Sequence, residues 1–145
     1  MNERYSRQII LPEVGAAGQA LLRDAAVLVV GAGGLGCAVL QYVCAAGVGR
    51  LTIVDHDFVD ESNLHRQPLY RTCDLASPKT RAARNALLEA NPDITVDVAA
   101  ERLTPANVAR LIGTADVVVD AADNFAVTYM LSDECHRVNK PLVSA

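Results

Sequence analysis

AVLVVGAGGLG, residues 26–36, joins an apolar run to a glycine-rich turn. The run predicts a buried strand over Ala26–Val30, and the residues after the turn predict a helix over Leu35–Ala46. Gly31, Gly33 and Gly36 form the pattern G-x-G-x-x-G, with Gly34 inside the same turn. Glycines there allow a tight turn and let backbone N–H groups approach a phosphate at the helix N-terminus. The alternative is a glycine-rich turn used only for packing.

Asp55 adds a second feature that is typical of nucleotide sites. It follows another predicted buried strand, Leu51–Val54, and comes 19 residues after Gly36. An acidic residue at this point commonly binds the ribose hydroxyls of a nucleotide. Together the turn and Asp55 predict nucleotide binding, but they do not separate ATP from NAD.

Strand and helix signals alternate along the chain. A short amphipathic helix is expected to end over Gln19–Ala25. Beyond Asp55, the expected elements are a helix from an N-cap at Ser77 and Pro78 to Asn91, a strand over Ile94–Ala99 near the sheet edge, a helix starting at Thr104-Pro105, a buried strand over Ala115–Ala121, a helix over Asn124–Asn139 and a strand start over Pro141–Ala145. This order predicts one α/β domain over residues 1–145, a Rossmann-type, doubly wound and mostly parallel sheet with helices on both faces.

The overall composition limits the classes of partner. The formal net charge is −4 and no basic tail is present, which argues against nucleic acid as a partner. The first ten residues hold no apolar segment, so we expect no signal peptide and a cytoplasmic protein. Ala25–Gly49 is uncharged and long enough to span a bilayer, but its clustered glycines favour a strand, a turn and a helix instead.

Four cysteines and three histidines suggest no metal or catalytic cluster. No two of the cysteines form a C-x-x-C pair, which makes a disulfide framework or a zinc site within this chain a weak hypothesis. Cys37 and Cys44 are seven apart on one predicted helix, and we expect both to face the core. We expect the histidines to be structural or exposed. These residues are Cys37, Cys44, Cys73, Cys135, His56, His65 and His136.

A long polar segment from about Asp57 to Ala76 separates the second strand from the next helix. A dehydrogenase usually enters a helix soon after its acidic residue, whereas this segment carries Asn63, Arg66 and Gln67. Arginine at a phosphate site stabilises charge that builds during phosphoryl chemistry. The alternative is a solvated loop without a role.

Lys79 and Asp123 are further candidates. Lys79 lies in the first turn of a predicted helix, where its positive charge opposes the helix dipole, so either it has a function or it is an ordinary surface lysine. Asp120 and Asp123 follow a buried strand, and carboxylates at a strand end can hold Mg²⁺ beside phosphate oxygens. Asp123 has a second possible role as the N-cap of the next helix.

These motifs, in this order, resemble the ThiF/MoeB/HesA adenylyltransferases, which are related to ubiquitin-activating enzymes. The resemblance covers essentially the whole chain and is more specific than any one motif. It rests on Arg4-Tyr5-Ser6-Arg7-Gln8, the GAGGLG turn, Asp55-x-Asp57, Ser62-Asn63-Leu64-His65-Arg66-Gln67, Pro78-Lys79, Asn91-Pro92 and Asp120-x-x-Asp123-Asn124.

The resemblance implies an enzyme that uses ATP and Mg²⁺ to adenylate the C-terminal Gly-Gly carboxylate of a ubiquitin-like sulfur carrier, of the molybdopterin or thiamine type. The glycine turn would cradle ATP, and Asp123 would bind magnesium. Arg7 would reach the active site of a neighbouring subunit, which implies a homodimer. The candidate catalytic residues are Arg7, Arg66, Lys79 and Asp123. The nucleotide-binding candidates are Gly31, Gly33, Gly34, Gly36, Asp55, Asp57, Ser62, Asn63, Arg66, Gln67, Lys79, Asp123 and Asn124.

Members of the resembled family usually continue beyond the point that matches Ala145. That later part carries two C-x-x-C zinc pairs and much of the carrier-binding surface, so we expect structural zinc only there. We also expect Leu142–Ala145 to enter a central strand, and this chain to be the N-terminal portion of such an enzyme. Two alternatives stay open: a non-catalytic scaffold that binds a carrier, and an NAD-dependent oxidoreductase.

Overall fold

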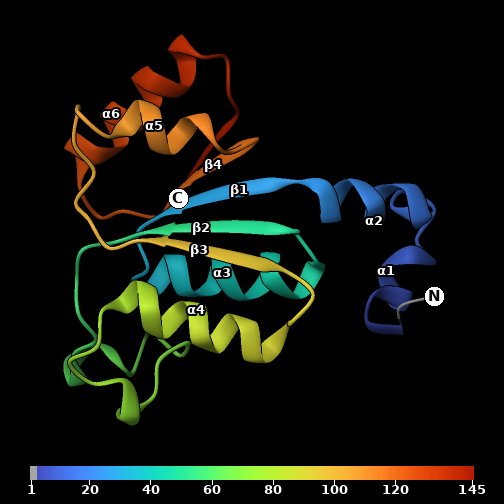
Figure 1. Cartoon of the computed structure of the whole chain (residues 1–145), viewed down its shortest axis with the longest axis horizontal. Helices are drawn as coiled ribbons and strands as arrows, with labels where there is room; N and C mark the ends of the chain where they lie inside the picture. The colour runs from blue at the N-terminus through green and yellow to red at the C-terminus, as the bar shows by residue number, and fades with distance from the viewer. Residues whose placement is uncertain (1–2) are drawn as a thin grey trace.

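A parallel sheet of five strands lies between two layers of helices (Figure 1). The computed structural model describes residues 3–145. The strand order is β3-β2-β1-β4-β5, and every neighbouring pair is parallel. The elements are a 3-10 helix η1 (Glu3–Tyr5), α1 (Ser6–Ile9), α2 (Gly15–Asp24), β1 (Ala26–Val30), α3 (Gly34–Ala46), β2 (Arg50–Val54), 3-10 helices η2 (Glu61–Asn63) and η3 (Thr72–Asp74), α4 (Lys79–Ala90), β3 (Thr95–Ala99), α5 (Val108–Gly113), β4 (Val117–Asp120), α6 (Phe125–Arg137) and β5 (Leu142–Ser144). The predicted fold class is confirmed.

Strand β1 is apolar throughout because both faces of the sheet are covered. Val27 and Val29 pack into a cluster with side chains of α3 and α4. Leu28 and Val30 pack on the opposite face, in a cluster with side chains of α5 and α6. A strand buried on both faces needs a continuous apolar run rather than alternation, which explains the sequence of residues 26–30.

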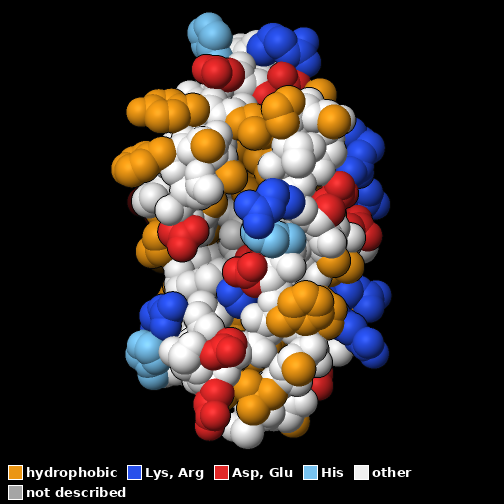
Figure 2. Space-filling view, turned by 90° about the vertical axis from the view of Figure 1, so that its left-hand side faces the viewer, with side chains coloured by type: hydrophobic (Ala, Val, Ile, Leu, Met, Phe, Trp, Pro, Cys, Tyr) orange, Lys and Arg blue, Asp and Glu red, His pale blue; other side chains and the backbone are white. Residues whose placement is uncertain are grey.

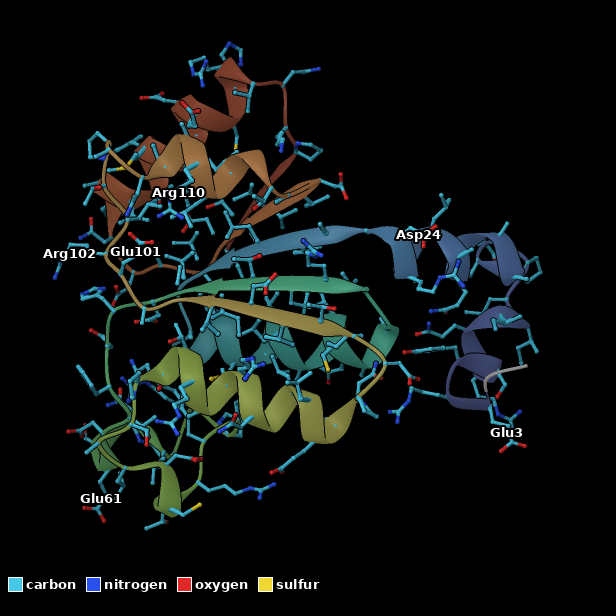
Figure 3. The ribbon with its side chains drawn as sticks, viewed as in Figure 1. Glu3, Asp24, Glu61, Glu101, Arg102 and Arg110 are labelled. Carbon is cyan, nitrogen blue, oxygen red and sulfur yellow. The ribbon has the colours of Figure 1, made fainter. Side chains whose placement is uncertain are left out.

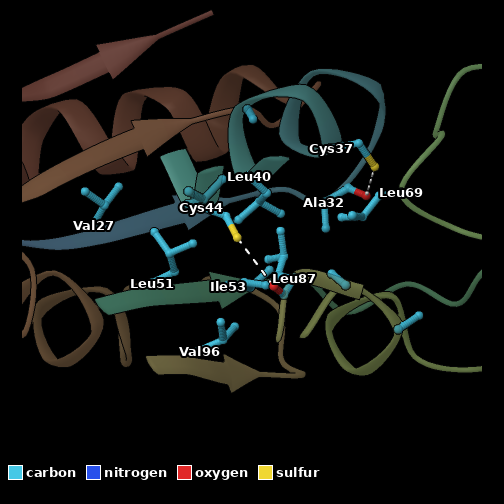
Figure 4. Close-up of a cluster of buried hydrophobic side chains, with 14 of the residues drawn as sticks. Val27, Ala32, Cys37, Leu40, Cys44, Leu51, Ile53, Leu69, Leu87 and Val96 are labelled. Carbon is cyan, nitrogen blue, oxygen red and sulfur yellow. Dashed lines mark hydrogen bonds between the residues drawn. The ribbon is translucent and has the colours of Figure 1, made fainter. Parts of the chain in front are cut away.

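The stretch that resembled a membrane span is divided between β1, the glycine turn and α3. Within residues 3–145, the helices are all too short or too polar to cross a bilayer. Cys37 and Cys44 of α3 are buried as expected, and the Cys44 thiol lies 3.4 Å from the Leu87 carbonyl oxygen of α4 (Figure 4). These cysteines therefore act as core side chains.

The N-terminal segment is fixed at the amino ends of the strands, far from their carboxyl ends (Figure 1). The buried Asn91 amide donates to the Tyr5 hydroxyl and to the Cys44 carbonyl, both at 2.8 Å. The amides of Gln8 and Gln19 both donate to the Ala46 carbonyl at 3.0 Å. These bonds attach α1 and α2 to the core.

The start of α4 differs from the prediction. Ser77 was expected to cap this helix, but α4 begins at Lys79, and no side chain caps it. The Ser77 carbonyl instead accepts a hydrogen bond from the Val59 N–H at 2.9 Å, beside an antiparallel bridge between Phe58 and Pro78. Pairing with the preceding loop therefore keeps Ser77 outside the helix.

Two other helix starts also shift. Thr104 was expected to begin a helix, but its N–H donates to the Asn107 side chain at 2.8 Å in a turn, and α5 begins at Val108. Helix α6 is capped by Asn124, whose side-chain oxygen accepts from the Ala126 N–H at 2.8 Å. The alternative that Asp123 is the N-cap is therefore wrong.

The two outer strands are β3 and β5. The expectation that the strand over Ile94–Ala99 lies near the edge is confirmed by β3. Leu142–Ser144 forms β5, which pairs with β4 in the sheet of residues 3–145, and the expectation of a central strand there stays a prediction.

Candidate functional site

A pocket of about 850 Å³ lies at the carboxyl ends of the strands. It includes the point between β1 and β4 where the strand order reverses, which is where doubly wound sheets bind ligands. Its volume is within the range of small-molecule sites. Figure 2 faces this end of the sheet and shows basic, acidic and histidine side chains gathered near the middle.

Most of the residues that the sequence suggested meet in this pocket. Those that line it are Gly31, Gly33, Gly34, Asp55, Asp57, Asn63, Arg66, Gln67, Lys79, Asp123 and Asn124. Three candidates do not line it: Arg7, Gly36 and Ser62. Arg7 is exposed on α1 at the opposite end of the sheet, and Gly36 is buried in α3.

The glycines of the turn have two different tasks. A Cβ atom on Gly31 would lie 2.6 Å from the Ala121 carbonyl oxygen, and one on Gly36 would overlap the Gly31 carbonyl oxygen. Gly31 also has a positive φ of 96°. Close packing of the turn therefore requires both. At Gly33 and Gly34 the nearest atoms to an added Cβ are 3.8 Å and 3.5 Å away, so packing does not require glycine there. Their missing side chains keep the pocket open at the N-terminus of α3.

Asp55 connects the glycine turn to the polar segment. Its carboxylate accepts a hydrogen bond from the Ala32 N–H at 2.7 Å and another from the Asp57 N–H at 2.7 Å. Each carboxylate oxygen can accept a second hydrogen bond. Asp55 can therefore organise the turn and still receive a ribose hydroxyl.

The polar segment is ordered around Asn63. The Asn63 side-chain oxygen accepts from Arg66 at 3.0 Å and from Gln67 at 3.1 Å. Arg66 also donates to the Ser62 carbonyl at 3.2 Å. Hydrogen bonds from the Ser62 hydroxyl and N–H lower the pKa of the Asp60 carboxyl. This segment is therefore a folded part of the pocket wall, with Ser62 supporting it from outside.

Lys79 is the buried cation of the site. Its side chain is only 7% exposed, and its ammonium lies 3.2 Å from a carboxylate oxygen of Asp57. The alternative of an ordinary surface lysine is therefore wrong. Placed at the first position of α4, this ammonium brings a positive charge into the pocket.

Asp120 and Asp123 have different environments. Asp120 is 1% exposed and accepts from the Ala122 N–H and the Ser144 hydroxyl. Asp123 is exposed, lines the pocket and makes no hydrogen bond or ion pair within residues 3–145. The Asp123 carboxylate is therefore free to bind a metal ion. A second group of possible metal ligands, whose ligand atoms all lie within 4.8 Å of one another, consists of Asp55, His56 and Asp57.

Sequence reasoning missed the wall that follows β3. Glu101 and Arg102 line the pocket there, and Figure 3 shows both at the carboxyl ends of the strands. The Arg102 guanidinium lies 2.9 Å from the His56 ring nitrogen. His56 is exposed, as expected, but it also lines the pocket. Arg110, with a smaller effect of Asn107, lowers the pKa of Glu101 through hydrogen bonds. The rule that ligands bind at the carboxyl ends of strands could have identified these residues.

The donors and acceptors of the pocket fit a nucleotide with a bound cation. Gly33 and Gly34 leave room for phosphates, Arg66 and Lys79 supply positive charge, and Asp123 offers a carboxylate. The side-chain oxygen of Gln67 is buried and has no hydrogen-bond partner among the described residues. A ligand hydroxyl or a metal-bound water would supply the donor that this oxygen lacks.

Known proteins are similar in sequence to this chain. The model of the ThiF family matches residues 5–145. Over 141 residues, the chain is 50% identical to the sulfur carrier protein adenylyltransferase of Thermus thermophilus and 47% identical to the adenylyltransferase and sulfurtransferase MOCS3 of Drosophila virilis. Each match covers 97% of this chain, but only 52% and 31% of those two relatives. The chain thus spans about half or less of the length of these relatives.

Solved structures share its fold. A crystal structure of the E. coli tRNA N6-threonylcarbamoyladenosine dehydratase TcdA in complex with ATP superimposes with a TM-score of 0.92 at 29% identity, covering 97% of this chain and 58% of that one. A crystal structure of E. coli MccB with ATP has a TM-score of 0.89 at 29% identity, covering 100% of this chain and 44% of that one.

Proposed function

The chain belongs to the ThiF family, and on this basis we propose that it forms the ATP-binding part of an enzyme that adenylates the C-terminal carboxylate of a ubiquitin-like sulfur carrier. One observation carries the proposal: the glycine turn, Arg66, Lys79 and Asp123 line a single pocket at the switch point of the sheet. Two relatives that share about half of the aligned residues are named as adenylyltransferases, one of them acting on a sulfur carrier protein.

The residues of the pocket fall into groups that suit the parts of ATP and its metal ion. Gly33, Gly34 and the N-terminus of α3 face the phosphates, where backbone N–H groups stabilise anions. Asp55 accepts the ribose hydroxyls. Arg66 and Lys79 offset phosphate charge, assisted by Asn63 and Gln67. Asp123 would hold Mg²⁺, which supplies positive charge beside the phosphates.

The proposed reaction needs no general base. A C-terminal carboxyl has a pKa of roughly 3.5, so it is ionised at neutral pH. One carboxylate oxygen forms a bond to the α-phosphorus, and the bond from that phosphorus to the bridging oxygen of the β-phosphate breaks. The products are an acyl-adenylate and pyrophosphate. Catalysis then rests on in-line positioning and on stabilising negative charge, which suits a pocket with Arg, Lys and Asp.

Exchange of labelled pyrophosphate into ATP tests this function in the full-length protein. We expect exchange only when a carrier ending in Gly-Gly is present, because its carboxylate is the nucleophile. The matched control is the same carrier with an amidated C-terminus. Exchange without any carrier, or none with a full set of candidate Gly-Gly carriers, would reject the proposal. A non-catalytic scaffold would bind a carrier without exchange, and an NAD-dependent oxidoreductase would show neither.

A further inference from the structure

Lys79 and Asp57 are held together by the main chain as well as by their charges. The Lys79 N–H donates to the Asp57 carbonyl at 2.9 Å, and the Asp57 N–H donates to the Asp55 carboxylate at 2.7 Å. The neighbouring residues Phe58 and Pro78 form an antiparallel bridge. The side-chain contact of 3.2 Å between the ammonium and the Asp57 carboxylate therefore lies within a fixed framework.

The burial of the two partners is unequal. The Lys79 side chain is 7% exposed and the Asp57 side chain is 54% exposed. A buried ammonium without a counter-charge is unfavourable, because burial removes its water. Asp57, at the open side of the pair, supplies that counter-charge without being buried itself.

Asp57 is a carboxylate, whereas the two arginines of the pocket contact neutral oxygen atoms or a histidine ring. Arg66 donates to neutral oxygen atoms of Ser62 and Asn63, and Arg102 contacts His56. Of the lysine and arginine side chains that line this pocket, Lys79 alone has a carboxylate partner within residues 3–145, and the same Asp57 carboxylate also lies 3.5 Å from the His56 ring nitrogen. A carboxylate beside a phosphate site repels the phosphate, so its place there calls for a reason.

We propose that Asp57 is a positioning residue that holds the Lys79 ammonium until a phosphate group replaces it. This inference rests on the proposed function. It states that the Asp57 side chain interacts with Lys79 and does not contact the nucleoside of ATP. The Asp57 carboxylate stabilises the protein before nucleotide binds and opposes the phosphate afterwards. Binding of a phosphate is thus an exchange of anionic partners at one lysine.

A double-mutant cycle tests the exchange in the full-length protein. The variants are Asp57→Asn, Lys79→Gln and their combination, with Asp57→Glu as the charge-preserving control. Glu101→Gln is a second control that removes another pocket carboxylate. Calorimetry measures the affinity for pyrophosphate, ATP and adenosine. The melting temperatures of the ligand-free variants measure how much the Asp57–Lys79 pair contributes to stability.

We expect Asp57→Asn to lower the melting temperature of the ligand-free protein. It should raise the affinity for pyrophosphate and ATP roughly five- to tenfold while leaving adenosine binding unchanged. In the Lys79→Gln background the same substitution should give a clearly smaller gain. Asp57→Glu should behave like the parent protein, and Glu101→Gln should give no comparable gain.

Other results would overturn the inference. Equal weakening of ATP and adenosine by Asp57→Asn would mean that Asp57 contacts the nucleoside, and equal gains in both backgrounds would mean that the pair is not coupled. If Asp57→Asn fails to fold, the double variant decides. Folding of the double variant would support the inference, because removing the lysine charge removes the need for Asp57. Failure of the double variant to fold would contradict the inference. A parent protein that binds pyrophosphate but not ATP would reject the proposed function, while the pyrophosphate cycle would still test the exchange.

Discussion

Asp123 contributes a negative charge without contributing to the fold. Its side chain is exposed and has no hydrogen-bond or salt-bridge partner within residues 3–145. The neighbouring Asn124 caps α6, so removal of the Asp123 carboxylate leaves the helix start intact. Its free carboxylate in the pocket is the feature expected of a magnesium ligand that shares the ion with phosphate oxygens.

We predict that Asp123→Asn and Asp123→Ala both fold normally and both lose adenylation. Pyrophosphate exchange should fall by hundreds-fold or more, because Asp123 would hold the Mg²⁺ ion that offsets phosphate charge. Melting temperature and carrier-dependent exchange at saturating Mg²⁺ measure the two effects. Asp133→Asn on the exposed part of α6 is the matched control. Near-parental exchange by a stable Asp123→Asn protein would remove Asp123 from the site.

At the scale of elements, the glycine turn between β1 and α3 is the most important part of the site. Some of its glycines are required for close packing, and others keep space open for the ligand. We predict that Gly36→Ala destabilises the protein by about 3 kcal/mol or more, because its Cβ atom overlaps the Gly31 carbonyl oxygen. Gly34→Ala should leave stability unchanged or slightly higher, since α3 begins there and an added Cβ has ordinary contacts. ATP affinity of Gly34→Ala should nevertheless fall at least about tenfold through lost phosphate space.

Denaturant unfolding and calorimetry on these two glycine variants separate the roles. The assigned roles would be contradicted if Gly34→Ala lost stability but kept its ATP affinity. They would also be contradicted if Gly36→Ala lost ATP affinity but kept its stability. Gly113→Ala is the control, because an added Cβ at Gly113 meets open space.

Elements with a strong local signal were predictable from the sequence, and contacts between distant segments were not. The apolar runs of β1 and β2 and the glycine turn predicted buried strands and a nucleotide site, because packing on both faces leaves a clear pattern. Ser77 failed as a cap because its carbonyl pairs with Val59, 18 positions earlier in the chain. Glu101 and Arg102 were missed because they belong to no local motif, although they follow a predicted strand whose carboxyl end lies at the pocket.

On the scale of the whole molecule, burial separates the four cysteines. Cys37, Cys44 and Cys135 are buried, and burial raises the pKa of each thiol, while Cys73 is exposed in η3. Thiols react as thiolates. Of these four, we therefore predict that only Cys73 reacts rapidly with a thiol reagent in the folded protein, as mapped by mass spectrometry. Cys73→Ser should abolish this fast labelling, and fast labelling of Cys37 would contradict the packing described for α3.

Arg7 lies at the opposite end of the sheet from the pocket, so any catalytic role requires a second copy of the chain. We propose that the full-length protein is a two-fold dimer in which Arg7 acts in the partner's site. Mixed dimers of Arg7→Ala and Asp123→Ala subunits should then regain part of the exchange activity, because one of their two sites is intact. Mixed dimers that form but stay inactive would argue against this role.

The central claim is that the pocket at the carboxyl ends of the strands holds ATP rather than a dinucleotide. Calorimetry of the full-length protein with ATP and Mg²⁺, and separately with NAD, tests it most directly. We expect ATP to bind and NAD not to bind, because Arg66, Lys79 and Asp123 form a site for a charged phosphate chain and its metal ion. Tighter binding of NAD than of ATP would contradict the claim.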